Sequence, residues 1–184
     1  MGRWTKVRWT EAGQITELLG WKSVQAPEAN LAPDAFFADL REAGRLQDAA
    51  YFLGQSLPRY EVVVWASEVV RELAKGEDRD SAALGAALDW VADPSESRRR
   101  VAYQAAAEAE PQSPGRIAAL AAFFSGGSIS PEGQPAVPAS RTSAGRLGAA
   151  AVVLAAIKSP DMKSALSWAL DRGEKIAIEG APKA

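Results

Sequence analysis

Residues 58–75 have the sequence PRYEVVVWASEVVRELAK, and this stretch carries the clearest helical pattern in the chain. Its apolar residues recur at spacings of three and four, as on one face of an α-helix. They are Val62, Trp65, Ala66, Val69 and Leu73. The run of three valines is also typical of a β-strand, but the continuation to Leu73 keeps the helical period. The stretch therefore predicts an apolar helix at the centre of the fold.

Outward from this stretch, similar patterns separated by glycine and proline predict an all-α protein with about eight helices and no sheet. The other expected helical ranges are 10–19, 34–44, 46–57, 81–92, 95–109, 116–124, 140–158 and 161–178. Residues 21–32 are expected to be an extended connection. We expect a compact bundle or a short stack of helical hairpins. Small residues such as Gly85 and Gly148 are expected where helices cross closely.

The domain organisation follows from these ranges. Residues 1–30 are expected to form an N-terminal arm with a short helix, and residues 31–180 a single helical domain. A loop rich in glycine and proline interrupts that domain at residues 125–139 and is expected to be a flexible connection. Residues 181–184 are expected to fray.

The composition excludes many kinds of chemistry. The 184 residues contain no cysteine and no histidine, so thiolate nucleophiles, disulfides and a Ser-His-Asp triad within the chain are excluded. The net charge of −2 argues against nucleic-acid binding. The longest uncharged apolar run, residues 147–157, is far shorter than the ~20 residues of a membrane span. We expect a cytoplasmic protein that is not an enzyme and has no cofactor.

Two clusters of charged residues have alternative interpretations. Glu61, Glu68 and Glu72 share one side of the central helix, where they would hold a metal or act as acid and base. We favour a solvated edge on which Glu68 pairs with Arg71. Residues 98–100 are three consecutive arginines, which would bind phosphate or an acidic partner. We favour pairing of one or two of them with nearby acids such as Asp93 and Glu96.

The tryptophans divide into two groups. Trp65, Trp90 and Trp168 lie in apolar helices and are expected in the core. The others lie near basic residues at the N-terminus, and tryptophan and arginine are enriched at interface hot spots. The expected partner-binding residues are Arg3, Trp4, Arg8, Trp9 and Trp21. Two alternatives stay open, because the arm can dock on a partner or fold back on its own domain.

Residues 57–66, LPRYEVVVWA, also resemble the L-P-R-x-E-x-V-W-W-A core of an uncharacterised proteobacterial family of domains of unknown function. Val64 stands where that core has its first tryptophan. The likeness covers residues 34–180. It implies no activity and no functional residue, but the family is loosely associated with type VI secretion gene clusters, which implies an accessory or adaptor role.

We therefore expect a non-enzymatic helical interaction domain that binds another protein. One alternative is a metal-binding domain or enzyme that uses the three glutamates. The other is a self-assembling structural subunit. The sequence does not indicate the oligomeric state.

Overall fold

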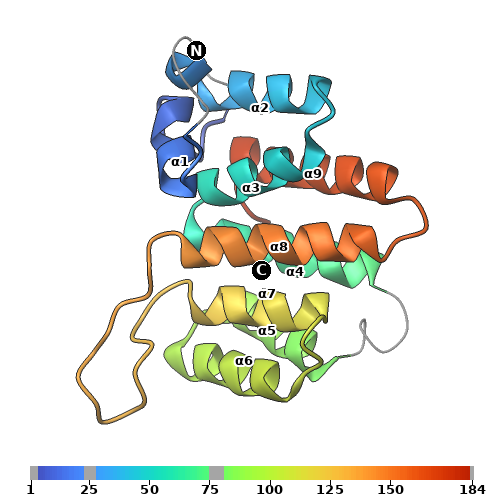
Figure 1. Ribbon diagram of the computed structural model, residues 1–184. Helices are drawn as coiled ribbons and strands as arrows, with labels where there is room; N and C mark the ends of the chain where they lie inside the picture. The colour runs from blue at the N-terminus through green and yellow to red at the C-terminus, as the bar shows by residue number, and fades with distance from the viewer. Residues whose placement is uncertain (1–3, 23–27, 75–80, 183–184) are drawn as a thin grey trace.

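The computed structural model describes residues 4–22, 28–74 and 81–182. Within these ranges the chain forms nine α-helices and no β-sheet, which confirms the all-α prediction (Figure 1). The helices are Ala12–Leu19 (α1), Pro33–Glu42 (α2), Leu46–Ser56 (α3), Arg59–Leu73 (α4), Ala82–Ala92 (α5), Glu96–Glu108 (α6), Pro114–Phe123 (α7), Ser143–Ile157 (α8) and Met162–Glu179 (α9). None of them is long and apolar enough to cross a membrane.

The helices stack in successive layers (Figure 1). α1 and α2 form one end of the stack, followed by α3 with α9 and then by α4 with α8. The other end consists of α5, α6 and α7. α8 packs against α3 and α4 and also against α7, so it joins the middle of the stack to the end formed by α5, α6 and α7. The predicted alternatives were a compact bundle and a short stack of helical hairpins, and the layers are stacked but pair helices that are distant in the sequence, α3 with α9 and α4 with α8.

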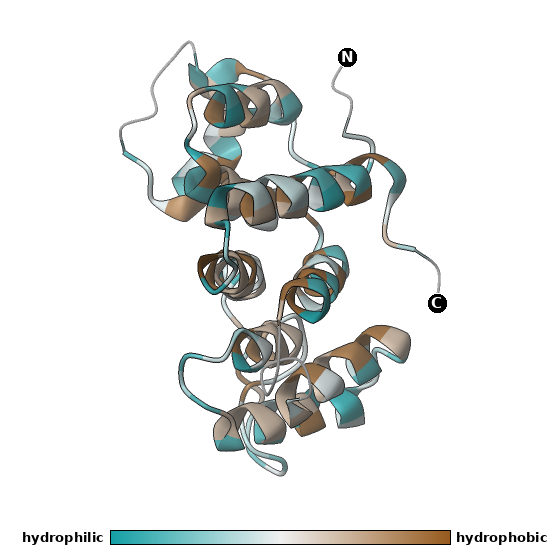
Figure 2. Ribbon diagram, turned by 90° about the vertical axis from the view of Figure 1, so that its right-hand side faces the viewer, coloured by the Kyte–Doolittle hydropathy of each residue, from teal (hydrophilic) through white to brown (hydrophobic). Residues whose placement is uncertain are grey.

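α4 lies at the centre, as predicted. Every residue from Val62 to Ser67 is buried, and the Trp65 indole N–H donates to the carbonyl of Ala169 in α9 at 2.8 Å. In Figure 2 the middle layer is seen nearly end-on, and brown and pale residues dominate it. Burial on almost all sides explains why β-branched valines are tolerated in this helix, since tertiary packing overrides local propensity.

Two helices of the middle layers cross with backbones in close approach. A Cβ atom on Gly54 of α3 would lie 2.7 Å from the carbonyl oxygen of Gly145 in α8, and one on Gly145 would lie 2.8 Å from that of Gly54. A Cβ atom on Gly148 of α8 would lie 2.7 Å from Cγ2 of Val62 in α4, so these two helices also approach closely, as expected for Gly148. Gly85 was expected at a crossing, but it is exposed and has no such neighbour, so that expectation was wrong.

Two further expectations need correction. Residues 21–32 are not simply extended, because Glu28–Asn30 form a 3₁₀ turn (η1) and residues 23–27 lie outside the described ranges. Trp168 is not a core residue, because 37% of its surface is exposed on α9, whereas Trp65 and Trp90 are buried as predicted. An apolar helix has a solvent face as well as a core face, and sequence spacing alone assigned Trp168 to the wrong one.

Candidate functional site: an arginine-lined cleft

The N-terminal arm folds back onto its own domain. The Trp4 ring packs against the Phe37 ring with centroids 5.1 Å apart, and only 7% of Trp4 is exposed. The backbone N–H of Lys6 donates to the carbonyl of Ala177 near the end of α9, at 3.0 Å. The sequence left two alternatives open for the arm, docking on a partner and folding back on its own domain, and the structure shows the second. Trp4 is thus a core residue and not a surface residue open to a partner, and Arg3 lies outside the described residues.

Beyond Trp4 the arm borders an open cleft of about 690 Å³. The cleft lies between the arm, α1, the end of α3, the α3–α4 corner and the residues before α8. Three of its lining residues are arginines, and we call it the arginine cleft. They are Arg8 from the arm, Arg59 from the start of α4 and Arg141 from the segment before α8.

The α3–α4 corner depends on a local feature of the sequence. Pro58 restricts Leu57 to extended backbone, because a residue before proline is disfavoured in the α region. Leu57 (φ −68°, ψ 145°) and Pro58 (φ −56°, ψ 155°) are both extended, so α3 ends at Ser56 and α4 begins at Arg59. The motif of residues 57–59 thereby places an arginine in the first turn of α4, beside the cleft.

The positive charge of the cleft has no counter-charge in its lining. No aspartate or glutamate lines it among the described residues. Within that part of the chain, Arg8 and Arg141 form no ion pair and no hydrogen bond, and both are exposed. Arg59 donates one hydrogen bond, from Nη1 to the carbonyl of Ser125 at 3.3 Å. Guanidinium groups in this state are available to an anionic group, which they bind in a planar, bidentate geometry.

The rest of the lining mixes apolar and polar groups. Trp9, Leu18, Leu57 and Pro58 give apolar surface, and Trp9 is half-buried. Gln55 is only 7% exposed, and its Oε1 atom has no hydrogen-bond partner among the described residues. Such an unpaired buried polar atom is uncommon in folded proteins. An apolar wall with a few convergent polar groups is typical of a binding site.

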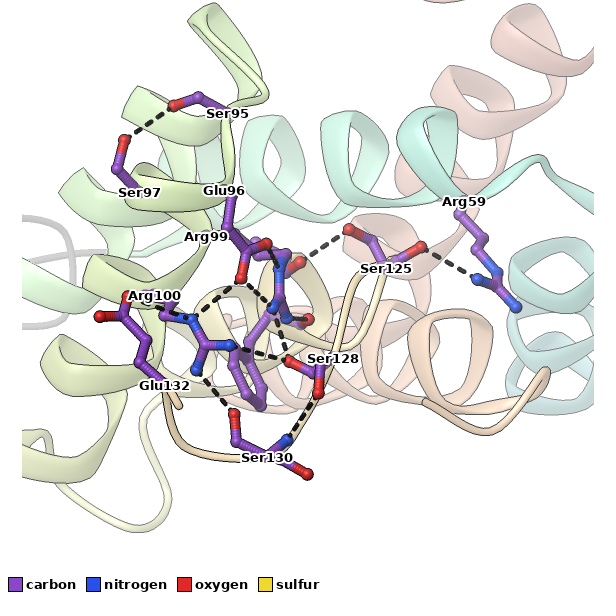
Figure 3. A network of polar contacts seen from close by, with 12 residues as sticks. Arg59, Ser95, Glu96, Ser97, Arg99, Arg100, Ser125, Ser128, Ser130 and Glu132 are labelled. Carbon is purple, nitrogen blue, oxygen red and sulfur yellow. Dashed lines mark hydrogen bonds and ion pairs between the residues drawn. The ribbon is translucent and has the colours of Figure 1, made fainter. Parts of the chain in front are cut away.

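A second polar cluster lies next to the cleft and holds the start of the long loop (Figure 3). Arg99 is 3% exposed and contacts Glu96 through two hydrogen bonds, of 2.7 and 2.8 Å. Its other donors reach the carbonyls of Phe123 and Ser128. Arg100 donates to Glu96 and to the carbonyl of Ser130. We call Glu96, Arg99 and Arg100 the loop clamp.

Pairing with Asp93 and Glu96 was predicted for one or two of the three arginines, and the structure shows it for all three, with Arg98 pairing with Asp93 at 2.9 Å. The hydrogen bond from Arg99 is the main cause that lowers the pKa of the Glu96 carboxyl below its usual value. The loop itself was expected to be a flexible connection. In the structure its first residues accept hydrogen bonds from the clamp, and an isolated bridge pairs Ser128 with Pro138.

The loop clamp and the arginine cleft are connected through one backbone carbonyl. Ser125 begins the clamped loop, and its carbonyl accepts the hydrogen bond from Arg59 (Figure 3). Arg59 also lines a smaller hollow of about 440 Å³ on the clamp side, together with Glu96 and Arg99. The position of the loop therefore contributes to the position of the Arg59 guanidinium.

Two of the three glutamates on the edge of α4, Glu68 and Glu72, lie in surface ion pairs. Glu68 pairs with Arg172 of α9 at 3.4 Å and not with Arg71, which corrects the expected partner. Arg71 lies 3.8 Å from Glu72. Among the described residues no group of three potential ligands is placed to hold a metal ion.

The structure brings together part of the predicted partner-binding set. Arg8 and Trp9 line the arginine cleft, whereas Trp21 is half-buried against the core and is not part of its lining. Arg59, Arg141 and Gln55 also line the cleft and were not predicted from the sequence as members of the site. Arg59 lies inside the LPR motif, so the motif was a usable signal for it. Nothing in the local sequence distinguishes Arg141 from other surface arginines.

Comparison with known proteins gives one match. Residues 36–177 match the profile of a family of unknown function, DUF6931. Neither the curated proteins nor the solved structures contain a match to the chain. The matched range includes the helices from within α2 to within α9 and contains Arg59, Arg141 and the whole loop clamp, but not Arg8 or Trp9. Because the match covers most of the chain, the protein belongs to the DUF6931 family.

Proposed function

We propose that this protein is a non-enzymatic interaction domain that receives a segment of another protein in the arginine cleft. The observation that supports the proposal is the lining of the cleft, with Arg8 and Arg141 unpaired among the described residues. Tryptophan and arginine are the residue types that dominate interface hot spots, and Trp9 lies with the three arginines here. The absence of histidine and cysteine from the sequence favours binding over catalysis.

We further propose that the domain serves as a cytoplasmic adaptor or accessory of a bacterial secretion apparatus. The support is the resemblance of residues 57–66 to a family core associated with type VI secretion gene clusters. Leu57, Pro58 and Arg59 of that motif all line the cleft. A shared motif that shapes a binding site is consistent with a shared partner class.

Photo-crosslinking in the native cell tests the interaction proposal. A photoreactive amino acid replaces Leu18, which lines the cleft, or in a control variant Ile157, which is 52% exposed at the end of α8. We expect a discrete protein adduct from position 18 that is absent from position 157 and lost when Arg141→Glu is added.

Two outcomes would overturn the proposal. If position 18 gives no adduct that position 157 lacks, the cleft does not receive a partner. An adduct with twice the mass of the chain would show that the cleft joins two copies, and the self-assembling alternative would replace the adaptor. Analysis of the adduct by mass spectrometry distinguishes these results and also tests the link to secretion.

A further inference from the structure

We propose that the segment bound in the arginine cleft is an acidic peptide, in which carboxylates flank an apolar side chain. This inference rests on the proposed function and specifies the chemistry of the partner. It is drawn from the charge of the lining, its apolar part and the size of the cleft.

The charge of the cleft selects an anionic ligand. Arg8, Arg59 and Arg141 come from three separate segments of the chain, and no carboxylate lines the cleft among the described residues. An acidic segment would supply the missing counter-charges without displacing any existing ion pair of Arg8 or Arg141, since neither has one in the described ranges. Forming such contacts does not first require an internal salt bridge to break.

The apolar wall distinguishes a peptide from a small anion. Trp9, Leu18 and Leu57 contribute apolar surface to a cleft of about 690 Å³. A cleft of this size is in the range of about 300–1,000 Å³ that holds drug-sized ligands, which a single phosphate or carboxylate would leave mostly empty. An apolar side chain between the carboxylates would cover the indole of Trp9, which is half-buried at the edge of the cleft.

The same features disfavour a nucleic acid. The net charge of −2 repels a long polyanion, and three arginines neutralise few phosphates. An acidic peptide carries its charge over a short length, so the local field of the cleft acts on it more than the field of the whole molecule. Screening by salt weakens such contacts.

The loop that the clamp binds also contacts Arg59, through the carbonyl of Ser125. Arg59 Nη1 donates to the Ser125 carbonyl at 3.3 Å, and Arg99 donates to the carbonyls of Phe123 and Ser128 on either side of Ser125. Arg99 is accordingly a positioning residue for the cleft, with no contact to the peptide.

Fluorescence anisotropy tests the inference with a short labelled peptide in which aspartates and glutamates flank a leucine. The matched control peptide has asparagine and glutamine in their places. We expect saturable binding of the acidic peptide alone. We expect Arg141→Ala and Arg8→Ala each to weaken it about tenfold, the scale of one charge-assisted hydrogen bond. Arg71→Ala removes the same charge outside the cleft and should leave binding unchanged.

Stability serves as the second readout. Arg8 and Arg141 have no partner among the described residues, so neither alanine variant should shift the melting temperature.

Equal binding of the two peptides to the wild type, or a loss of binding in Arg71→Ala as large as in the cleft variants, would overturn the inference. If inorganic phosphate raises the melting temperature of the wild type but not of Arg141→Ala, and the peptide raises neither, the cleft holds a small anion instead. A crosslinked partner without an acidic segment would refute this inference and leave the interaction proposal standing.

Discussion

At the scale of single residues, Arg99 is the most heavily engaged side chain of the polar network. Its donors are shared between the two carboxylate oxygens of Glu96 and the carbonyls of Phe123 and Ser128. The guanidinium also lies 4.6 Å above the centroid of the Phe123 ring. Gly127 passes so close that a Cβ atom there would lie 2.8 Å from Arg99 Nη2, and its φ of +62° suits glycine. The loop therefore follows a path set by one buried cation.

Replacing Arg99 with alanine should destabilise the protein by about 2–3 kcal/mol. The change removes a buried charge with its hydrogen bonds and leaves the carbonyls of the loop without a donor. Urea denaturation measures the free energy of unfolding. Arg98→Ala is the matched control, because Arg98 pairs with Asp93 at the surface and should cost at most about 0.5 kcal/mol. Equal losses in the two variants would contradict a structural role for the clamp.

The lowered pKa of Glu96 predicts how the clamp responds to acid. The folded state holds the pKa of this carboxyl below its usual value of 4.5, so the stabilisation is complete above that value and is lost as the pH falls through the folded-state pKa. Glu96→Gln should lower the melting temperature at neutral pH. The difference from wild type should then shrink as the pH falls below about 4.5 towards the folded-state pKa. A difference that does not change with pH would show that the charge of Glu96 has no part in the clamp.

At the scale of elements, two glycines on helices predict opposite effects of one substitution. Gly145→Ala should destabilise the protein by about 1–3 kcal/mol, because the new Cβ would lie 2.8 Å from the Gly54 carbonyl and force α3 and α8 apart. Gly85→Ala should stabilise by about 0.5–1 kcal/mol, because Gly85 is exposed on α5 and alanine has the higher helix propensity. Melting curves of the two variants, compared with the wild type, measure the sign of each change in stability. A gain in stability for Gly145→Ala would contradict the close crossing.

The elements are also the scale at which the sequence is most informative. The periodic pattern from Val62 to Leu73 and the cap at Ser81, whose hydroxyl accepts from the N–H of Leu84, are local, so they are readable without the fold. The targets of Arg99 are backbone carbonyls up to 29 residues away, and no local pattern encodes them. The same holds for the arginine cleft, which joins the arm, the α3–α4 corner and the residues before α8. Residue type suggested Arg8 and Trp9, the LPR motif is a usable signal for Arg59, and only the fold adds Arg141.

At the scale of the whole molecule, the N-terminal arm closes the structure by contacting the last helix. The Thr5 hydroxyl donates to the carbonyl of Ile178, a residue 173 positions later, and Lys6 bonds to Ala177 beside it. Trp4 lies between Phe37 and Phe52. Deleting the arm would therefore expose core aromatic rings as well as remove two cleft residues, so a truncation cannot separate folding from binding.

Point substitutions in the arm separate the two effects. Trp4→Leu should destabilise the protein by about 2 kcal/mol, because a smaller side chain leaves a cavity against Phe37. The acidic peptide should still bind below the melting temperature, because Trp4 does not line the cleft. Trp9→Ala should cause a clear loss of peptide binding in folded protein, together with some loss of stability, because Trp9 is half-buried against the core. Denaturation and anisotropy on the same preparations measure both quantities. If Trp4→Leu weakened binding as strongly as Trp9→Ala in fully folded protein, the arm would act as one unit, and the division between its buried and its binding half would be wrong.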